Sequence, residues 1–227
     1  RRKLIGRVAL PALVAEAELE RGRRDEYSRR DWRIAAGALD VADLKRTPFY
    51  EFHVKAGAKM VDFAGWEMPL LYRGILEEHQ HTRTAASIFD VSHMGRLKFT
   101  GKGAEGFLQK VCTRNVRKAT GGQSMYSLVC NESGGILDDV IVSRFAEGAG
   151  HWMVVCNASN REKLLGWFAK INAQTPTHGP CEIEDETEKT GMVAIQGPKA
   201  VQLLDDVLPE PVSDIGRYHF EVMRYLM

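Results

Sequence analysis

Two apolar runs separated by a cluster of turn-forming residues stand out in the pattern of the chain. Residues 126–130 (YSLVC) and 136–143 (ILDDVIVS) are rich in β-branched and aliphatic side chains, and residues 131–135 (NESGG) between them tolerate positive φ. This pattern predicts a β-hairpin. Asp138 and Asp139 lie in its second strand and must point to opposite faces, because side chains alternate along a strand. The carboxylate that faces the apolar side needs a partner, either a hydrogen bond within the protein or the amine of a ligand.

Helical and strand patterns continue along the rest of the chain. Thr47 and Pro48 favour a helix start, with Thr47 as the cap and Pro48 at the first helical position. Further helices are predicted over residues 75–86, 103–112, 161–172 and 199–208, and strands over residues 59–63, 96–100, 152–156, 192–195 and 218–222. The chain is therefore expected to mix short helices with short strands.

Composition and charge narrow the classes of partner. With 227 residues the chain is long enough for one large domain or two small ones, and its formal net charge of +1 favours neither nucleic acid nor a membrane surface. The longest apolar run near the start, residues 8–15, is too short to span a bilayer and lacks a secretory cleavage pattern. Acidic residues at 16, 18 and 20 argue against a transit peptide, so the reducing cytoplasm is the expected location.

Residues 1–40 differ in texture from the remainder. They alternate basic and acidic residues around a segment rich in Ala and Leu, for which two short helices with solvated faces are the neutral interpretation. We interpret them as an N-terminal extension of unknown role, either a piece of a longer chain or an upstream extension of the reading frame.

Three kinds of reactive side chain have simpler structural interpretations. Four widely spaced cysteines form no CxxC pair and are expected to be buried, reduced thiols: Cys112, Cys130, Cys156 and Cys181. His79 and His81 are two residues apart and point away from each other on a helix, so a solvated face is favoured over a metal pair. Asp90, Ser92 and His93 suggest a hydrolase triad, but closeness in sequence is not triad geometry, and no GxSxG elbow is present.

Four stretches together carry a family resemblance. They are residues 44–69 (LKRTPFYEFHVKAGAKMVDFAGWEMP), 89–95 (FDVSHMG), 130–142 (CNESGGILDDVIV) and 194–198 (AIQGP). Their order and spacing resemble the glycine cleavage system T protein, an aminomethyltransferase. The resemblance runs from about Leu44 to the end of the chain, and it indicates a natural start near Val41, which leaves residues 1–40 outside the family pattern.

The resemblance implies a one-carbon transfer. Family members take the aminomethyl group from the lipoyl arm of a carrier, the H protein, and pass its carbon to tetrahydrofolate with release of ammonia. They require no metal. The essential aspartate of the family matches Asp139, where a carboxylate can accept a proton from a folate amine or stabilise the iminium-like cation as ammonia leaves.

Further folate contacts follow from the resemblance by position. Met94 and Tyr126 match residues that line the folate cavity, Asn157 matches a residue that hydrogen-bonds the pterin, and Tyr218 matches a tyrosine near the ligand. Structural alternatives remain open, with Met94 and Tyr126 as core residues and Asn157 as a helix cap. Asp138 is expected to be structural.

The resemblance also implies an α+β fold, a cloverleaf of three α+β units around the folate. Residues 41–98 and 184–227 are expected to form one discontinuous unit, and residues 99–183 an inserted α/β unit that carries the hairpin. The family pattern continues past residue 227, so the chain is expected to hold the first two units of a C-terminally truncated cloverleaf and to be inactive by itself.

Two other classes of function compete with the aminomethyltransferase. One is a folate-binding relative, such as the folate domain of a sarcosine or dimethylglycine dehydrogenase or an iron–sulfur assembly factor. The other is a non-catalytic binding module. The combination of DVSHMG and GGILDD favours the T protein.

Overall fold

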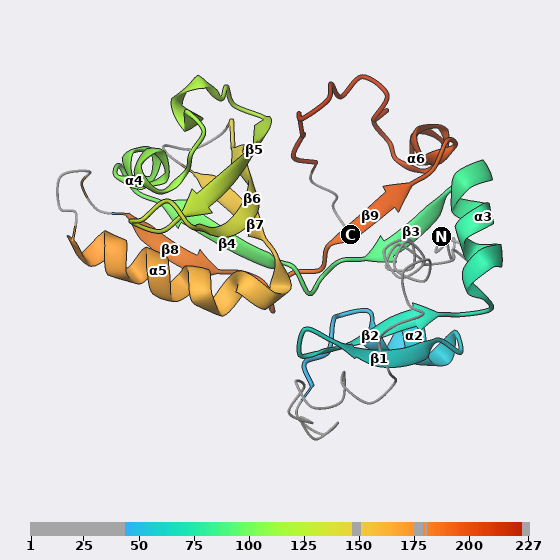
Figure 1. The fold of residues 1–227 in the computed structure, drawn as a ribbon. Coiled ribbons are helices and arrows are strands. Elements are labelled where there is room, and N and C mark those ends of the chain that lie inside the picture. The colour runs from blue at the N-terminus through green and yellow to red at the C-terminus, as the bar shows by residue number, and fades with distance from the viewer. Residues whose placement is uncertain (1–43, 147–150, 175–178, 180, 224–227) are drawn as a thin grey trace. The chain divides into compact units, whose positions relative to one another are not determined.

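The chain divides into two compact units. The computed structural model describes residues 44–146, 151–174, 179 and 181–223 (Figure 1). Unit 1 contains residues 44–92 and 191–212, and unit 2 contains the described parts of 93–190 and 213–223. The predicted extension, residues 1–40, lies outside the described residues, and the predicted division at residues 98 and 184 stays a prediction. In the described part of the chain, no helix is long and apolar enough to cross a bilayer.

Unit 1 is built from two small antiparallel sheets and three helices. Strand β1 pairs with β2 through a turn at Ala64 and Gly65, which both adopt positive φ, and β3 pairs with β9. The elements are α2 (Tyr50–Lys55), β1 (Lys59–Phe63), β2 (Trp66–Leu71), α3 (Ile75–Thr84), β3 (Ser87–Asp90), β9 (Val193–Gln196) and α6 (Ala200–Val207). The β2 strand was not predicted, and its Pro69 is tolerated because β1 and β2 form a sheet of two strands.

A buried polar network replaces the predicted cap of the first helix. The Thr47 hydroxyl donates to Asp90 Oδ2 at 2.6 Å, and His53 Nε2 lies 2.9 Å from the same oxygen. Helix α2 begins at Tyr50, and its N-cap is Phe49 rather than Thr47. Burial alone would raise the pKa of Asp90, but hydrogen bonds from His53, Ser92 and Thr47 outweigh it and hold the pKa below its usual value.

The Ser92 hydroxyl is fully engaged within unit 1. It donates to the Met192 carbonyl at 3.2 Å and accepts from the Met192 amide at 3.0 Å. Its backbone amide in turn donates to Asp90 Oδ1 at 2.9 Å. These contacts give Ser92 a structural role and leave no basis for a serine nucleophile.

Unit 2 contains a five-stranded antiparallel sheet with the order β5-β6-β7-β4-β8. Its elements are β4 (Gly95–Thr100), α4 (Ala104–Val111), η4 (Val116–Lys118), β5 (Gln123–Cys130), β6 (Ile136–Arg144), β7 (Trp152–Cys156), η5 (Ala158–Asn160), α5 (Arg161–Gln174) and β8 (Glu182–Asp185). The predicted hairpin is confirmed as β5 and β6. Its turn is closed by Asn131, whose Oδ1 accepts the amides of Ser133 at 3.1 Å and Gly135 at 2.7 Å.

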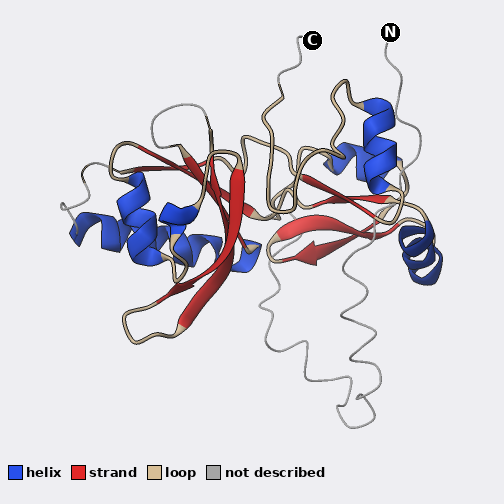
Figure 2. Cartoon of the chain, turned by 90° about the horizontal axis from the view of Figure 1, so that it is seen from above, coloured by secondary structure: helices blue, strands red, loops and turns tan. Residues whose placement is uncertain are grey.

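Three phenylalanines join the helices of unit 2 to one face of its sheet. Phe99 on β4 lies 5.9 Å from Phe107 of α4 and 5.6 Å from Phe168 of α5, measured between ring centroids. All three side chains are buried, and Figure 2 shows both helices on the same side of the sheet. Unit 2 is therefore a two-layer structure with a helical face and a second sheet face that these helices do not cover.

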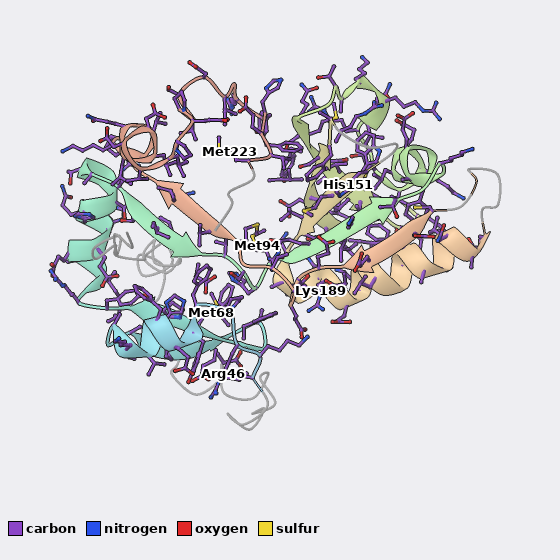
Figure 3. All side chains as sticks on the ribbon, turned by 180° about the vertical axis from the view of Figure 1, so that it is seen from behind. Arg46, Met68, Met94, His151, Lys189 and Met223 are labelled. Atoms are coloured by element: carbon purple, nitrogen blue, oxygen red, sulfur yellow. The ribbon has the colours of Figure 1, made fainter. Side chains whose placement is uncertain are left out.

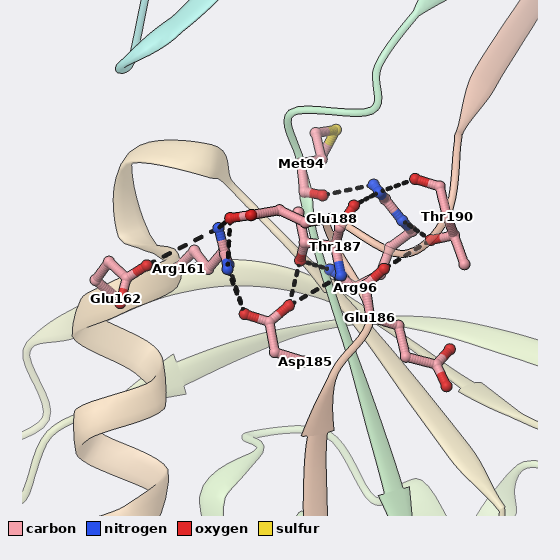
Figure 4. Close-up of polar contacts among 9 residues, drawn as sticks. All are labelled: Met94, Arg96, Arg161, Glu162, Asp185, Glu186, Thr187, Glu188 and Thr190. Atoms are coloured by element: carbon pink, nitrogen blue, oxygen red, sulfur yellow. Dashed lines mark hydrogen bonds and ion pairs between the residues drawn. The ribbon is translucent and has the colours of Figure 1, made fainter. Parts of the chain in front are cut away.

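Arg96 of β4 and Arg161 of α5 form hydrogen bonds and ion pairs with the last residue of β8 and the turn that follows it (Figure 4). Arg161 at the start of α5 holds Asp185 at 2.6–2.7 Å, and Arg96 on β4 donates to Thr187 and to both oxygens of Thr190. Burial alone would raise the pKa of Asp185, but hydrogen bonds from Thr187 and Arg161 hold it below its usual value. These contacts tie the turn after β8 to the sheet.

The predicted strand over residues 218–222 is wrong. Tyr218 has φ of 60°, a left-handed conformation that an extended strand does not admit. An isolated bridge between Gln123 and His219, with hydrogen bonds from Ser124 N to Tyr218 O and from Phe220 N to Gly122 O, attaches this segment to the start of β5 and to the residue before it.

The four cysteines are free thiols, and burial affects three of them strongly. Cys112, Cys156 and Cys181 are buried, whereas Cys130 is half-buried. Burial raises the pKa of Cys112 and of Cys156 to about 12, and that of Cys181 to about 11. Gly95 packs against Cys156 so closely that a Cβ at this position would overlap Sγ.

These thiols predict an alkaline loss of stability. The unfolded thiol releases its proton near pH 8.5, while the folded thiol keeps it until about pH 12, so the unfolded state binds fewer protons in this window. The free energy of unfolding should therefore fall as pH rises from about 9 toward 12. In urea titrations across this range, Cys156→Ala should reduce the slope by up to about 1.4 kcal/mol per pH unit. An unchanged slope would contradict the account.

Candidate functional site

The second sheet face of unit 2 carries Asp139. Along β6, the buried residues Asp138, Val140 and Val142 face the helices, and Asp139 and Ile141 point to the opposite face, where both are exposed. Leu128 on β5 is the pairing partner of Asp139. On the other side, the pairing of Ile141 with Val155 continues the register so that Asn157 follows opposite Asp139. The predicted split of the two carboxylates between faces is confirmed.

Both oxygens of the Asp139 carboxylate accept a hydrogen bond. The Tyr126 hydroxyl donates to Oδ2 at 2.8 Å from a diagonal position on β5, and the Asn157 side-chain amide donates to Oδ1 at 2.9 Å. The hydrogen bond to Asp139 is the main cause that raises the pKa of Tyr126, so the phenol stays protonated and remains the donor. The carboxylate is thus held in one orientation while it remains exposed to a ligand.

Asp138 occupies the buried side of the same strand, with 3 % of its surface exposed. It accepts hydrogen bonds from the Asn157 backbone amide at 3.0 Å, from Asn157 Nδ2 at 2.8 Å and from Asn160 Nδ2 at 2.6 Å. The partner that a buried carboxylate requires is therefore supplied by the protein rather than by a ligand.

Asn157 does not serve as a helix cap through its side chain. It stands at the N-cap position of η5, but its side chain makes no capping hydrogen bond. Its Nδ2 atom instead contacts both carboxylates of β6. Of the two interpretations that its residue type allows, the structure thus excludes the side-chain cap.

Met94 and Tyr218 belong to the same unit but are not hydrogen-bonded to Asp139. Met94 immediately precedes β4 (Figure 3). The pairing of Gly95 with Cys156 places it next to Asn157 in register. Its carbonyl accepts from Arg96 Nη1 at 2.7 Å, and its side chain is half-buried. Tyr218 is exposed, and the Arg217 guanidinium lies 5.2 Å from its ring centroid.

The hydrogen bonds of Asn157 and Asn160 to Asp138 were not predicted from the sequence. Asn157 and Asn160 form an Asn-x-x-Asn spacing directly after a buried strand, which is the signal that could have indicated them. The single turn of η5 places both side chains against Asp138, near the first residues of β6.

A separate cavity of about 720 Å³ lies at the other end of the hairpin, near Gly121 and Gly122. Its lining includes Phe145 and His151, whose rings stack with centroids 4.3 Å apart, and Phe220. Burial lowers the pKa of His151, so the ring is neutral near pH 7. Asp139, Tyr126 and Asn157 do not line this cavity.

The site presents one hydrogen-bond acceptor, the Asp139 carboxylate, in a fixed orientation. Asp139 presents an acceptor-only carboxylate, and two neighbouring donors hold it in place. Such a group can take a proton from a bound amine or stabilise a developing cation.

Comparison with known proteins decides the family. The model of the GCVT N-terminal domain matches residues 49–225. The chain belongs to this family. The predicted resemblance to the glycine cleavage T protein is therefore confirmed.

Two curated relatives of this GCVT N-terminal domain are both named aminomethyltransferase. The chain is 49 % identical over 183 residues to an aminomethyltransferase of Rubrobacter xylanophilus. The aligned region covers 81 % of the chain and 47 % of that relative. It is 41 % identical over 180 residues to an aminomethyltransferase of Chloroherpeton thalassium, and this aligned region covers 78 % of the chain and 47 % of that relative. The chain thus spans about half the length of the curated relatives it matches.

A solved structure supports the predicted α+β fold. The crystal structure of glycine cleavage system aminomethyltransferase T from Bartonella henselae superposes with a TM-score of 0.65 at 39 % sequence identity. The match covers 72 % of the present chain and 43 % of that protein. The α+β fold of the T protein family is therefore confirmed for the part of the chain that is matched.

Proposed function

We propose that this chain is the part of a tetrahydrofolate-dependent aminomethyltransferase that carries the catalytic aspartate. The protein transfers the carbon of an aminomethyl group, held on the lipoyl arm of the H protein, to tetrahydrofolate and releases ammonia. The observation that carries the proposal is the Asp139 carboxylate, exposed on a sheet face and hydrogen-bonded by Tyr126 and Asn157 in a chain of the GCVT N-terminal domain family.

Asp139 is the catalytic residue in this proposal. Ammonia leaves the aminomethyl carbon, and one folate nitrogen bonds to that carbon and loses a proton, which balances the proton that the departing amine takes up. The carbon–sulfur bond to the lipoyl arm then breaks as an iminium-like cation forms on the folate, and a second folate nitrogen bonds to the carbon and loses a proton, while the lipoyl sulfur leaves as a thiol. A carboxylate beside these atoms stabilises the cation and accepts the proton. Because Asp139 is already oriented by two donors, little rearrangement is needed when the charge develops.

Four side chains are proposed to contact the folate: Met94, Tyr126, Asn157 and Tyr218. Tyr126 and Asn157 are supported by their hydrogen bonds to Asp139, and Met94 by its place beside Asn157 in the strand register. Tyr218 is supported by the hydrogen bond between its carbonyl and Ser124 on the strand of Tyr126.

Holding folate beside the lipoyl arm contributes proximity, which is a large term in such transfers. We place the reaction in the cytoplasm.

The activity itself is tested with the full-length gene product. It should release ammonia and form methylenetetrahydrofolate when supplied with aminomethylated H protein and tetrahydrofolate, with the Rubrobacter xylanophilus aminomethyltransferase as the positive control. Tetrahydrofolate binding without ammonia release would instead favour another folate-binding relative. Absence of both would overturn the proposal.

The 227-residue chain by itself should bind folate weakly. It spans about half the length of its matched relatives, so we expect a folate site assembled in the full-length protein to be incomplete in the isolated chain. Titration of the purified chain with tetrahydrofolate, followed by calorimetry, should show no binding in the micromolar range. A micromolar dissociation constant would contradict this expectation.

A further inference from the structure

The Asn157 side chain bridges the two neighbouring carboxylates of β6. Its Nδ2 atom lies 2.8 Å from Asp138 Oδ1 and 2.9 Å from Asp139 Oδ1. A side-chain amide nitrogen carries two hydrogens, so one can point to each carboxylate. The carboxylate on the exposed face is thereby linked, through a single amide, to the carboxylate on the buried face.

Asp138 is the fixed end of this bridge. It is buried, and its oxygens also accept from the Asn157 backbone amide at 3.0 Å and from Asn160 Nδ2 at 2.6 Å. An ionised carboxylate only accepts hydrogen bonds, so it can hold the nitrogen of the Asn157 amide and not the oxygen.

We propose that Asp138 is a positioning residue, which acts on Asp139 through the orientation of the Asn157 amide. This inference rests on the proposed function, because it assigns Asp139 the reacting carboxylate. If the amide turned by half a rotation, Asn157 Oδ1 would face Asp139, and two acceptors would repel each other where a hydrogen bond of 2.9 Å now stands. Asp138 excludes that orientation and so keeps Asp139 in place.

The first test replaces Asp138 by asparagine in the full-length gene product. The amide of Asp138→Asn can donate to Asn157 and permits the turned orientation. The turnover number kcat for aminomethyl transfer should fall about 10- to 100-fold, the scale of a small misplacement of a reacting group, while KM for tetrahydrofolate changes little. A loss confined to KM, or a kcat within twofold of wild type, would overturn the proposal.

A double-mutant cycle tests whether Asp138 acts through Asn157. In an Asn157→Ala background no amide remains to be oriented, so adding Asp138→Asn should cost no further kcat. Losses that multiply would show that the two residues act independently and would contradict the inference.

Asn160→Ala is the matched structural control. It removes a hydrogen bond to the same Asp138 carboxylate without touching Asn157, so it should lower thermal stability and leave kcat unchanged. A fall in kcat equal to that of Asp138→Asn would indicate general loosening and overturn the assignment.

A second variant keeps the inference testable if Asp138→Asn fails to fold. Asn157→Asp keeps the size and shape of the side chain but places a third carboxylate between Asp138 and Asp139. The bridge predicts a kcat at or below that of Asn157→Ala, whereas kcat near wild type would refute it. The proposed function is judged separately, by wild-type ammonia release and by its dependence on Asp139.

Discussion

Asp139→Asn should reduce aminomethyl transfer by about 10²- to 10⁴-fold, the range that a positioned acid–base group contributes. The asparagine has the same shape and can keep a hydrogen bond with each of Tyr126 and Asn157, because its oxygen still accepts and its nitrogen can donate to the phenol oxygen. What it loses is the negative charge that stabilises the cation and the ability to take a proton. The measurement is ammonia release by the full-length gene product under saturating tetrahydrofolate.

Glu132→Gln provides the matched control for this variant. Glu132 is an exposed carboxylate in the turn of the same hairpin, paired with Lys170 at 3.2 Å on the surface. Its neutralisation should leave the rate unchanged and cost little stability, because exposed ion pairs contribute little. Should Asp139→Asn retain activity within threefold of wild type, Asp139 would be removed from the mechanism.

Phe99→Ala should produce the largest loss of stability, about 3–5 kcal/mol. The Phe99 ring is fully buried and touches the rings of Phe107 and Phe168, so truncation opens a cavity between the sheet and both helices. Each lost aromatic pair adds to the cost of the cavity. Urea-dependent reaction of the buried thiols Cys112 and Cys156 with a thiol reagent reports the opening of unit 2 directly.

Ile136→Ala is the control for the same unit. Ile136 begins β6 with 65 % of its surface exposed, and exposed positions away from special features change stability by within about 0.5 kcal/mol. If Phe99→Ala cost less than about 1 kcal/mol, the three-ring cluster would not be the core of unit 2.

The hairpin could be predicted because its signals are local. Apolar runs of β-branched residues and a turn closed by Asn131 and positive-φ Gly134 are each encoded within a few residues. Alternation along β6 then separates Asp138 from Asp139, and the burial of one and the exposure of the other follow from it.

The bridge through Asn157 could not be predicted in the same way. It depends on the register between β6 and β7, which pairs Ile141 with Val155 and is set by packing across the sheet rather than by either strand alone. The predicted strand over residues 218–222 is wrong because Tyr218 adopts a positive φ, at a residue whose carbonyl accepts a hydrogen bond from Ser124 of β5. Apolar composition alone does not report such a backbone conformation.

A crystal structure of the full-length gene product with tetrahydrofolate bound would show directly whether Asp139 is the reacting carboxylate. We expect a nitrogen of the pterin side within hydrogen-bonding distance of the Asp139 carboxylate, about 2.7–3.2 Å, with Tyr126 and Asn157 still donating to that carboxylate. Folate bound at another place, with Asp139 in contact with solvent alone, would contradict this assignment.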